Sequence, residues 1–216
     1  MKLYGYWRSG AAYRVRIALH VKGVPYEHVG VHLARGGGEQ HTPAYRAINP
    51  QGRVPTLVLD DGSMIIQSPA ILEWIEDMYP EPPLLPADKT LRTQVRGVAA
   101  LIGCDIHPLT NAGNSGPASY LRRAFKADDA AVHAWTAHWT TAGFGAVEAL
   151  IEAAPCCFGS APTLADVYLV PQVVSARRFK VPLDIFPKIV RAAEHCMGLE
   201  PFRRAAPENQ PDAEVR

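Results

Sequence analysis

A serine stands where an expected strand turns into an expected helix, and this position could stabilise an anion. Leu3 to Trp7 is aromatic-rich without a helical period, which predicts a strand, whereas apolar residues from Gly10 to a stop at residues 23–25 have helical spacing. The first amides of such a helix lack partners within it and lie at the positive end of its dipole. A thiolate held beside Ser9 would therefore face backbone N–H groups. The alternative, that Ser9 only caps the helix, stays open at this point.

Two further segments could bind a peptide-like or anionic ligand. Pro55 follows Val54 at the start of an expected strand, and a cis bond there would leave the Val54 backbone free to pair with a peptide-like ligand. A trans proline at a sheet edge is the alternative. Gln67 and Ser68 precede another expected helix, where exposed amides suit a carboxylate and where Ser68 could also cap the helix.

The elements that must position these residues alternate between strand and helix up to residue 80. A second strand is expected at residues 26–33, and Thr42-Pro43 is typical of a helix start. Residues 56–59 and 64–67 flank a hairpin turn at Asp60–Ser63, and a helix over residues 70–78 follows. This order predicts a thioredoxin-like α/β domain at residues 1–80.

A proline-rich linker is expected to separate this domain from a helical one. Four prolines among residues 80–86 exclude a helix and favour extended chain. Apolar residues then recur at helical spacing in residues 91–102, 131–153 and 164–174, and Thr163 with Asp166 is typical of a capping box. We therefore expect a linker at residues 81–87 and an all-α domain at residues 88–216.

Composition and charge exclude several classes of function. The chain has 216 residues, 48% of them apolar, and its 22 Lys and Arg balance 21 Asp and Glu. Because the net charge is close to zero, the protein is not expected to bind nucleic acid or a membrane surface. Neither a signal peptide nor an apolar run long enough to cross a membrane is visible. Its four cysteines lack the spacing of a metal site or a disulfide framework. We expect ordinary thiols, no bound metal and a cytoplasmic location.

The residues at the end of the first strand decide where a thiol must come from. In a redox-active thioredoxin-like domain a cysteine would stand there, because the thiolate is the nucleophile. This chain has Arg8-Ser9-Gly10-Ala11 instead. The thiol must therefore arrive with a ligand, and the Ser9 hydroxyl with the helix amides would lower its pKa from the usual value of about 8.5.

Several motifs, in order along essentially the whole chain, resemble the glutathione transferase superfamily. They are the serine at the strand end, Val54-Pro55, residues 67–71 and the proline linker before a helical domain. The segment from Arg8 to Leu19 is similar to the zeta-class signature, as are Asn49-Pro50, residues 103–109 and residues 164–172. The resemblance implies a homodimeric, glutathione-dependent cis–trans isomerase of maleylacetoacetate or maleylpyruvate, in which glutathione is catalytic and is not consumed.

The resemblance also assigns parts of the glutathione site to this chain. The thiolate would add to the electron-poor cis double bond, the new single bond would rotate, and elimination would return the thiol. Ser9 would support the sulfur, the Val54 backbone would pair with the cysteinyl part, and Gln67 and Ser68 would hold the γ-glutamyl end. His41 and Gln51 would approach the glycyl end, and Pro55 completes the set of expected glutathione-binding positions near Val54.

A dicarboxylate substrate needs fixed cations, and arginine forks match carboxylates. Arg8, beside Ser9, is the first choice. Arg177 and Arg178, at the end of the helix that begins near Thr163, are the second, with the alternative that one of them caps this helix or pairs at the surface. His107 and Asn111 are further expected pocket residues, although a histidine on a helix can also simply be packed there.

Two departures from the zeta-class pattern leave the substrate open. Gly10 and Ala11 replace a second serine and a cysteine, and Ala112-Gly113 stands where relatives that act on maleylpyruvate carry arginines. Arg122 or Arg123 could supply the missing clamp. A general glutathione transferase or dehalogenase acting on small electrophiles is therefore a second hypothesis, and a non-catalytic glutathione-binding domain is a third.

Overall fold

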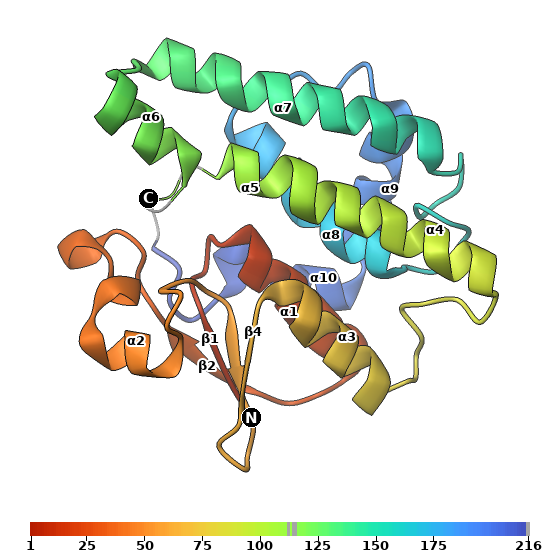
Figure 1. The fold of residues 1–216 in the computed structure, drawn as a ribbon. Coiled ribbons are helices and arrows are strands. Elements are labelled where there is room, and N and C mark those ends of the chain that lie inside the picture. The colour runs from red at the N-terminus through yellow and green to blue at the C-terminus, as the bar shows by residue number, and fades with distance from the viewer. Residues whose placement is uncertain (112, 114–115, 215–216) are drawn as a thin grey trace. The chain divides into compact units, whose positions relative to one another are not determined.

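The computed structural model describes residues 1–111, 113 and 116–214, and the chain divides into two compact units. Unit 1 consists of Met1–Pro83 together with the C-terminal segment from Leu199 onward, and unit 2 is Leu84–Gly198. The ribbon in Figure 1 shows the elements of each unit. The two units correspond to the expected α/β and all-α parts of a glutathione transferase fold.

Unit 1 is built on a four-stranded sheet with the order β2-β1-β3-β4. Its elements are β1 (Lys2–Gly5), α1 (Gly10–Val21), β2 (Glu27–Gly30), α2 (Pro43–Ile48), β3 (Thr56–Val58), β4 (Met64–Ile66), α3 (Ser68–Met78) and α10 (Glu200–Ala205), with short 3-10 turns at Arg35–Gly37, Glu39–His41 and Pro207–Asn209. Strand β1 pairs parallel with β2 and antiparallel with β3, and β3 pairs antiparallel with β4. Helices α1 and α3 pack on each other, with α2 on the other side of the sheet (Figure 1).

Local signals placed most of these elements correctly. Thr42 caps α2, its hydroxyl accepting from the Tyr45 amide with Pro43 in the first turn, as predicted. The hairpin of β3 and β4 is confirmed. The core of unit 1 is apolar, because Leu3, Ile17 and Leu57 are fully buried between the sheet and its helices.

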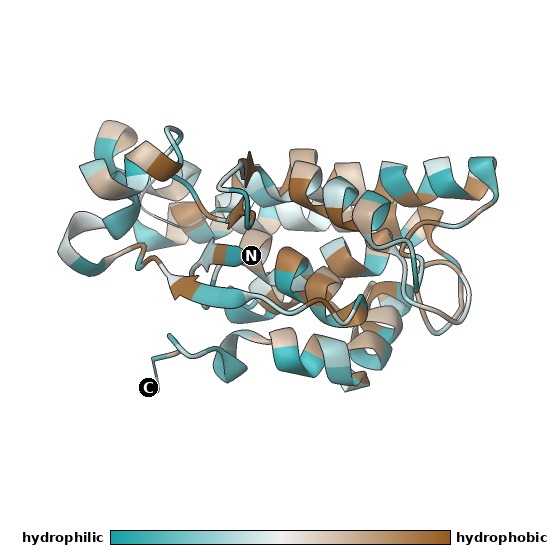
Figure 2. Ribbon diagram, turned by 90° about the horizontal axis from the view of Figure 1, so that it is seen from below, coloured by the Kyte–Doolittle hydropathy of each residue, from teal (hydrophilic) through white to brown (hydrophobic). Residues whose placement is uncertain are grey.

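The regular elements in the described part of unit 2 are all helices. Its elements are α4 (Lys89–Ala100), a π-helical stretch (Leu101–Ile106), α5 (His107–Thr110), α6 (Pro117–Phe125), α7 (Asp129–Leu150), α8 (Leu164–Arg178) and α9 (Pro187–Gly198). The expected capping box at Thr163 and Asp166 is present at the start of α8. Brown and teal segments alternate along the helices in Figure 2, the pattern of helices with one apolar side.

The boundaries of the two units differ from the expected ones at two places. Leu84 and Leu85, expected in the linker, are buried, and the Leu84 carbonyl accepts from the Leu164 amide at 2.7 Å. Residues from 199 onward, expected in the helical domain, belong to unit 1 because α10 packs on α1, where Arg16 donates to the Ala205 carbonyl at 2.9 Å. Long-range contacts of this kind leave no local signal in the sequence.

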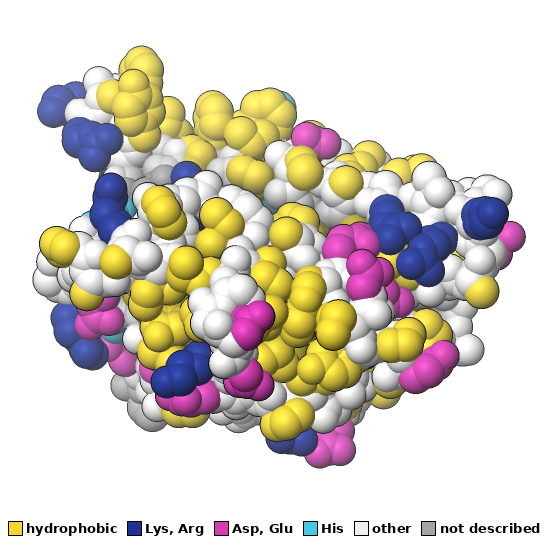
Figure 3. Space-filling model, turned by 60° about the horizontal axis from the view of Figure 1, so that its bottom comes forward, with side chains coloured by type: hydrophobic (Ala, Val, Ile, Leu, Met, Phe, Trp, Pro, Cys, Tyr) yellow, Lys and Arg dark blue, Asp and Glu magenta, His cyan; other side chains and the backbone are white. Residues whose placement is uncertain are grey.

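The surface agrees with the balanced composition. On the face shown in Figure 3, acidic and basic side chains are interspersed among apolar ones. None of the helices in the described part of the chain combines the length and apolar character that crossing a bilayer requires.

Candidate glutathione and substrate site

Strand directions bring three of the predicted binding segments to one edge of the unit 1 sheet. Tyr4, Thr56 and Ile66 form one row across β1, β3 and β4. Because β3 runs opposite to its two neighbours, the start of β3 lies at the same edge as the ends of β1 and β4. Ser9, Val54 and Gln67 follow or precede these strands at that edge, and adjacent strands lie about 5 Å apart.

Ser9 is the N-cap of α1, which confirms one half of its expected role. Its backbone is extended, with φ −72° and ψ 118°, and its Oγ accepts from the Ala12 amide at 3.2 Å. Because Oγ is the acceptor in this contact, its proton is available to another group. Within the described residues the amides of Gly10 and Ala11 make no hydrogen bond. One hydroxyl and two amides therefore remain to bind an anion here.

A buried polar network fixes the loop that carries Val54. The Tyr45 hydroxyl and the Asn49 Nδ2 donate to the Arg53 carbonyl at 2.7 and 2.8 Å, and both also contact Thr56 Oγ1. Burial raises the pKa of Tyr45, so its phenol stays a donor. The Val54–Pro55 bond is cis. Sequence reasoning missed these network residues; the one signal for them was the motif that contains Asn49.

Gln67 has an unusual backbone conformation at the start of α3. Its φ is 71° and ψ is 121°, and it occupies the N-cap position, with Ser68 as the first helical residue. The prediction that Ser68 caps α3 is therefore wrong, because Gln67 holds the N-cap position and no side-chain cap hydrogen bond forms there among the described residues. The Gln67 Nε2 donates to the Gln51 Oε1 at 2.7 Å, so the structure brings these two predicted residues together.

Unsatisfied backbone groups make this edge suitable for a peptide-like ligand. In the described part of the chain, the N–H and C=O of Val54 and the amide of Ser68 have no hydrogen-bond partner. Together with the Gly10 and Ala11 amides, they offer one strand-like pairing position and two helix starts. Glutathione, a peptide with a thiol and terminal carboxylates, fits this set of donors and acceptors.

Arg8 and His41 lie in the loops of the same unit. The Arg8 guanidinium carbon is 5.1 Å from the centroid of the Trp7 ring and 6.0 Å from that of Tyr6. His41 is exposed, and its Nε2 lies 3.1 Å from the Gln40 Nε2. Stacking on a ring restrains the Arg8 side chain while its N–H donors stay available for a carboxylate.

The predicted residues of unit 2 lie at the ends of its helices. His107 begins α5, directly after the π-helical stretch, and the Asn111 Oδ1 accepts from the Gly113 amide at 2.8 Å. The Ala112 position of the predicted Ala112-Gly113 loop lies outside the described residues. Because π-helical segments are often found at functional sites, the position of His107 directly after one is compatible with a role in binding.

The arginines of unit 2 have partners within that unit. Arg177 Nη2 pairs with the Glu194 carboxylate at 2.8 Å, and both side chains are well exposed. Arg178 lies over the Phe179 ring at 4.6 Å. Arg122 pairs with a carboxylate of Asp129 at 2.7 Å. Surface pairing, the alternative weighed for Arg177, is thus what the structure shows for that side chain.

A cluster of two thiols and a carboxylate in unit 2 serves the fold. The Sγ atoms of Cys156 and Cys196 are 3.9 Å apart beside Asp166. The Asp166 oxygens already accept from the backbone amides of Cys157 and Thr163. The neighbouring Cys156 thiol and burial raise the pKa of Cys196, so this thiol stays protonated in the packed cluster.

Comparisons with known proteins place the chain among its relatives. The sequence model of the glutathione S-transferase N-terminal domain matches residues 3–83. The maleylacetoacetate isomerase of Pseudomonas aeruginosa is 52% identical, with 98% of each chain covered, and the maleylpyruvate isomerase of a Ralstonia species is 53% identical, with 99% of this chain and all of the relative covered. A solved maleylpyruvate isomerase, described as a bacterial glutathione transferase in the zeta class, superposes with a TM-score of 0.94 at 51% identity and covers 99% of this chain and 100% of its own. The chain belongs to the zeta-class glutathione transferases.

Zeta-class membership confirms the fold and the family that the sequence motifs indicated. Another relative of known structure, the maleylacetoacetate isomerase of Anaeromyxobacter dehalogenans, is described with dicarboxyethyl glutathione and citrate bound in its active site. It superposes with a TM-score of 0.86 at 39% identity, covering 99% of this chain and 97% of its own.

Proposed function

We propose that this zeta-class glutathione transferase is a glutathione-dependent cis–trans isomerase of maleylpyruvate or maleylacetoacetate. The observation that carries the proposal is the Ser9 hydroxyl at the start of α1, in a segment without a cysteine and beside two amides that have no partner among the described residues. Full-length relatives at about half identity that are named as isomerases of these two substrates support it.

Bound glutathione supplies the thiolate, which adds to the cis double bond and leaves again once the resulting single bond has rotated. The protein's part is to hold that sulfur as an anion. The Ser9 Oγ accepts from the Ala12 amide, so its hydroxyl proton is free to donate to the sulfur. The amides of Gly10 and Ala11 lie at the positive end of the α1 dipole and stabilise the same anion. The same groups retain the thiolate after elimination, so that each turnover starts from an ionised thiol.

The remaining edge groups orient the peptide. The Val54 backbone, next to Pro55, pairs with the cysteinyl part like an added strand. The Ser68 amide at the start of α3 and the Gln67 side chain hold the γ-glutamyl carboxylate. The Gln67 Nε2 also donates to Gln51, which the family resemblance assigns to the glycyl end.

Substrate carboxylates require cations that are not already neutralised. Arg8 has no carboxylate partner among the described residues, whereas Arg177 is paired with Glu194, so Arg8 is the preferred clamp. In unit 1, His41 is the proposed residue for the glycyl end of glutathione, and in unit 2 Arg178, His107 and Asn111 remain the proposed pocket residues. Unit 1 thus carries the proposed glutathione-binding residues and the preferred substrate clamp, Arg8.

We also propose that the protein is a cytoplasmic homodimer. Support for association is the exposure of large apolar side chains on unit 1: Met64 at 50% and Ile66 at 37% lie on the edge strand β4, and Met78 at 57% ends α3. Its four cysteines are free thiols, in keeping with a reducing compartment. Sedimentation velocity showing a monomer at micromolar concentration would contradict the dimer.

The test compares the two substrates side by side. Purified protein is mixed with maleylpyruvate or maleylacetoacetate, with and without glutathione, and loss of the cis-enoyl absorbance is followed. We expect turnover of at least one substrate, strictly dependent on glutathione. Turnover of neither substrate would refute the proposed function, and release of halide from an α-halo acid instead would identify a dehalogenase.

A further inference from the structure

The peptide group of Trp7, just before Ser9, is held by two oppositely charged side chains. The Trp7 amide donates to the Asp212 Oδ2 at 3.0 Å, and the Trp7 carbonyl accepts from the Arg16 Nη2 at 2.9 Å. Arg16 is fully buried, and the Asp212 side chain is 22% exposed. The Ser9 amide donates to the Tyr6 carbonyl at 2.9 Å and closes the turn that contains Trp7. The serine turn is therefore fixed from outside by α1 and by the C-terminal segment.

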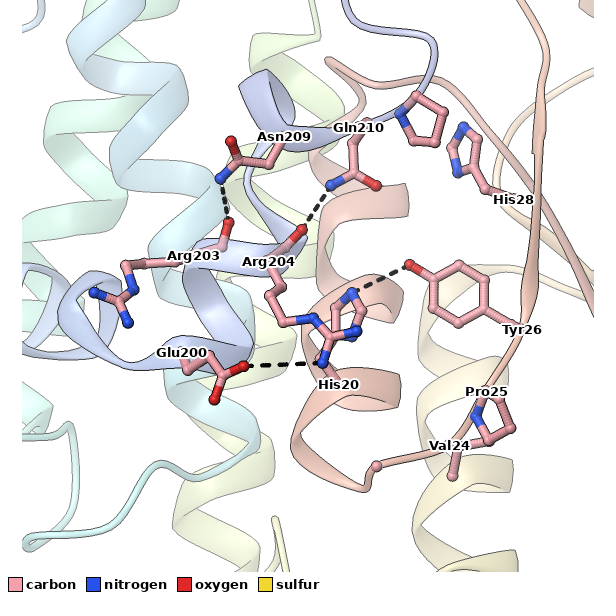
Figure 4. A pocket seen from close by; sticks show the side chains of 12 residues that line it. His20, Val24, Pro25, Tyr26, His28, Glu200, Arg203, Arg204, Asn209 and Gln210 are labelled. Atoms are coloured by element: carbon pink, nitrogen blue, oxygen red, sulfur yellow. Dashed lines mark hydrogen bonds and ion pairs between the residues drawn. The ribbon is translucent and has the colours of Figure 1, made fainter.

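The C-terminal segment that carries Asp212 is itself anchored within unit 1. Figure 4 shows Asn209 and Gln210 pointing back to α10, where they donate to the carbonyls of Arg203 and Arg204 at 2.7 and 2.9 Å. Beyond this anchor, the Asp212 Oδ1 lies 2.8 Å from the His28 Nε2, although neither atom forms a hydrogen bond among the described residues. The anchored segment therefore holds the Asp212 carboxylate against the Trp7 amide on one side and the His28 ring on the other.

The geometry points to Asp212 as a positioning residue of the thiol site. We infer that its carboxylate sets the Trp7 peptide, and through it the Ser9 hydroxyl and the first amides of α1, in the place where the sulfur of glutathione is held as an anion. The inference rests on the proposed function for its catalytic consequence. The contact itself is independent of the proposed function, since the Trp7 amide donates to Asp212 in the protein without any ligand.

Small displacements of the turn at residues 6–9 are expected to lower the rate of the reaction. Ser9 is joined to Trp7 through Arg8 alone, so a shift of the Trp7 peptide moves the hydroxyl by a similar amount. Misplacement of a catalytic group by about 1 Å can cost about 100-fold in rate. Glu214 offers a matched control in the same segment, because among the described residues its carboxylate pairs with the side chains of His32 and Arg35 and not with Trp7.

The experiment compares Asp212→Ala, Asp212→Asn and Glu214→Gln with the wild type. Four quantities are measured: exchange of the Trp7 amide by NMR, the thiol pKa of bound glutathione from its thiolate absorbance, kcat, and the glutathione dissociation constant. For Asp212→Ala we expect faster Trp7 exchange, a thiol pKa raised by about one unit and kcat lowered about tenfold, the fold-change that one pKa unit corresponds to. The glutathione dissociation constant should change less than kcat. Asp212→Asn keeps an oxygen for Trp7 and should restore most of each value, and Glu214→Gln should match the wild type.

The measurements on these variants either support or overturn the positioning role of Asp212. Faster Trp7 exchange with an unchanged thiol pKa in Asp212→Ala would overturn the inference, as would equal effects in Glu214→Gln. If Asp212→Ala does not fold, Asp212→Glu replaces it: the carboxylate is kept but displaced by one methylene, and a raised thiol pKa is again expected. A thiol pKa that responds to Asp212 in a protein without isomerase activity would uphold the positioning role and refute the proposed function alone.

Discussion

Replacing Ser9 with alanine should separate two contributions of one hydroxyl. The first is structural: Oγ caps α1 by accepting from the Ala12 amide at 3.2 Å. Removing an N-cap hydroxyl costs about 1 kcal/mol of stability. The second is chemical, because the hydroxyl proton is left to donate to a thiolate. A hydrogen bond to a charged group contributes about 1.5–3 kcal/mol, which corresponds to a rise of about 1–2 units in the thiol pKa.

The two contributions are measured by different assays. Urea unfolding of Ser9→Ala reports the lost cap, and titration of the thiolate absorbance of bound glutathione reports the lost donor. At a pH below the thiol pKa, the thiolate fraction and with it kcat should fall about 10- to 100-fold. Ser9→Gly is the matched control: glycine is a fair N-cap, so stability should fall by only a few tenths of a kcal/mol while the thiol pKa still rises.

A rescue variant completes this test. Ser9→Thr keeps a hydroxyl at the N-cap and should retain a thiol pKa closer to that of the wild type than either other variant. The reasoning is refuted if Ser9→Ala binds glutathione with an unchanged thiol pKa, since the amides of α1 would then suffice and the hydroxyl would serve only as a cap.

The remaining predictions concern stability. Glu76→Gln would leave the buried Lys22 ammonium, now 2.6 Å from the Glu76 carboxylate, without its counter-charge and should lower the free energy of unfolding by about 3–5 kcal/mol in urea titrations. Burial lowers the pKa of His20 to about 4, so the unfolded chain takes up the proton first and stability should fall as pH drops from about 6.5 to 4; a His20→Gln variant whose urea midpoint falls as steeply would contradict this. Gly103→Ala would place a Cβ 2.8 Å from Tyr168 Cε1 and should cost about 1–3 kcal/mol, whereas an unchanged melting temperature would show that the ring can move.

Local rules sufficed for the parts of the fold whose causes are local. The cap at Ser9, the helix start at Thr42 and the box at Thr163 with Asp166 each depend on residues a few positions apart, and each was predicted. The predicted cap of α3 was wrong because Gln67 adopts a positive φ, a conformation that glutamine rarely adopts.

Long-range contacts set the limit of the sequence reasoning. The return of the C-terminal segment to unit 1 depends on Arg16 and Asp212, whose partners are distant in the chain. The same limit applies to the site: Arg177 was a reasonable clamp by type and position, but its pairing with Glu194 depends on α9 lying beside α8. Residues that meet only through the fold cannot be matched by spacing.

The thiol balance during turnover tests the central claim most directly. Maleylpyruvate or maleylacetoacetate is supplied in large excess over a small amount of glutathione, and trans product and free thiol are both quantified after many turnovers. We predict many moles of trans product for each mole of glutathione, with the free thiol unchanged at the end. Loss of one thiol for each molecule of substrate consumed would contradict the account, because glutathione would then be a reactant and the protein a conjugating transferase.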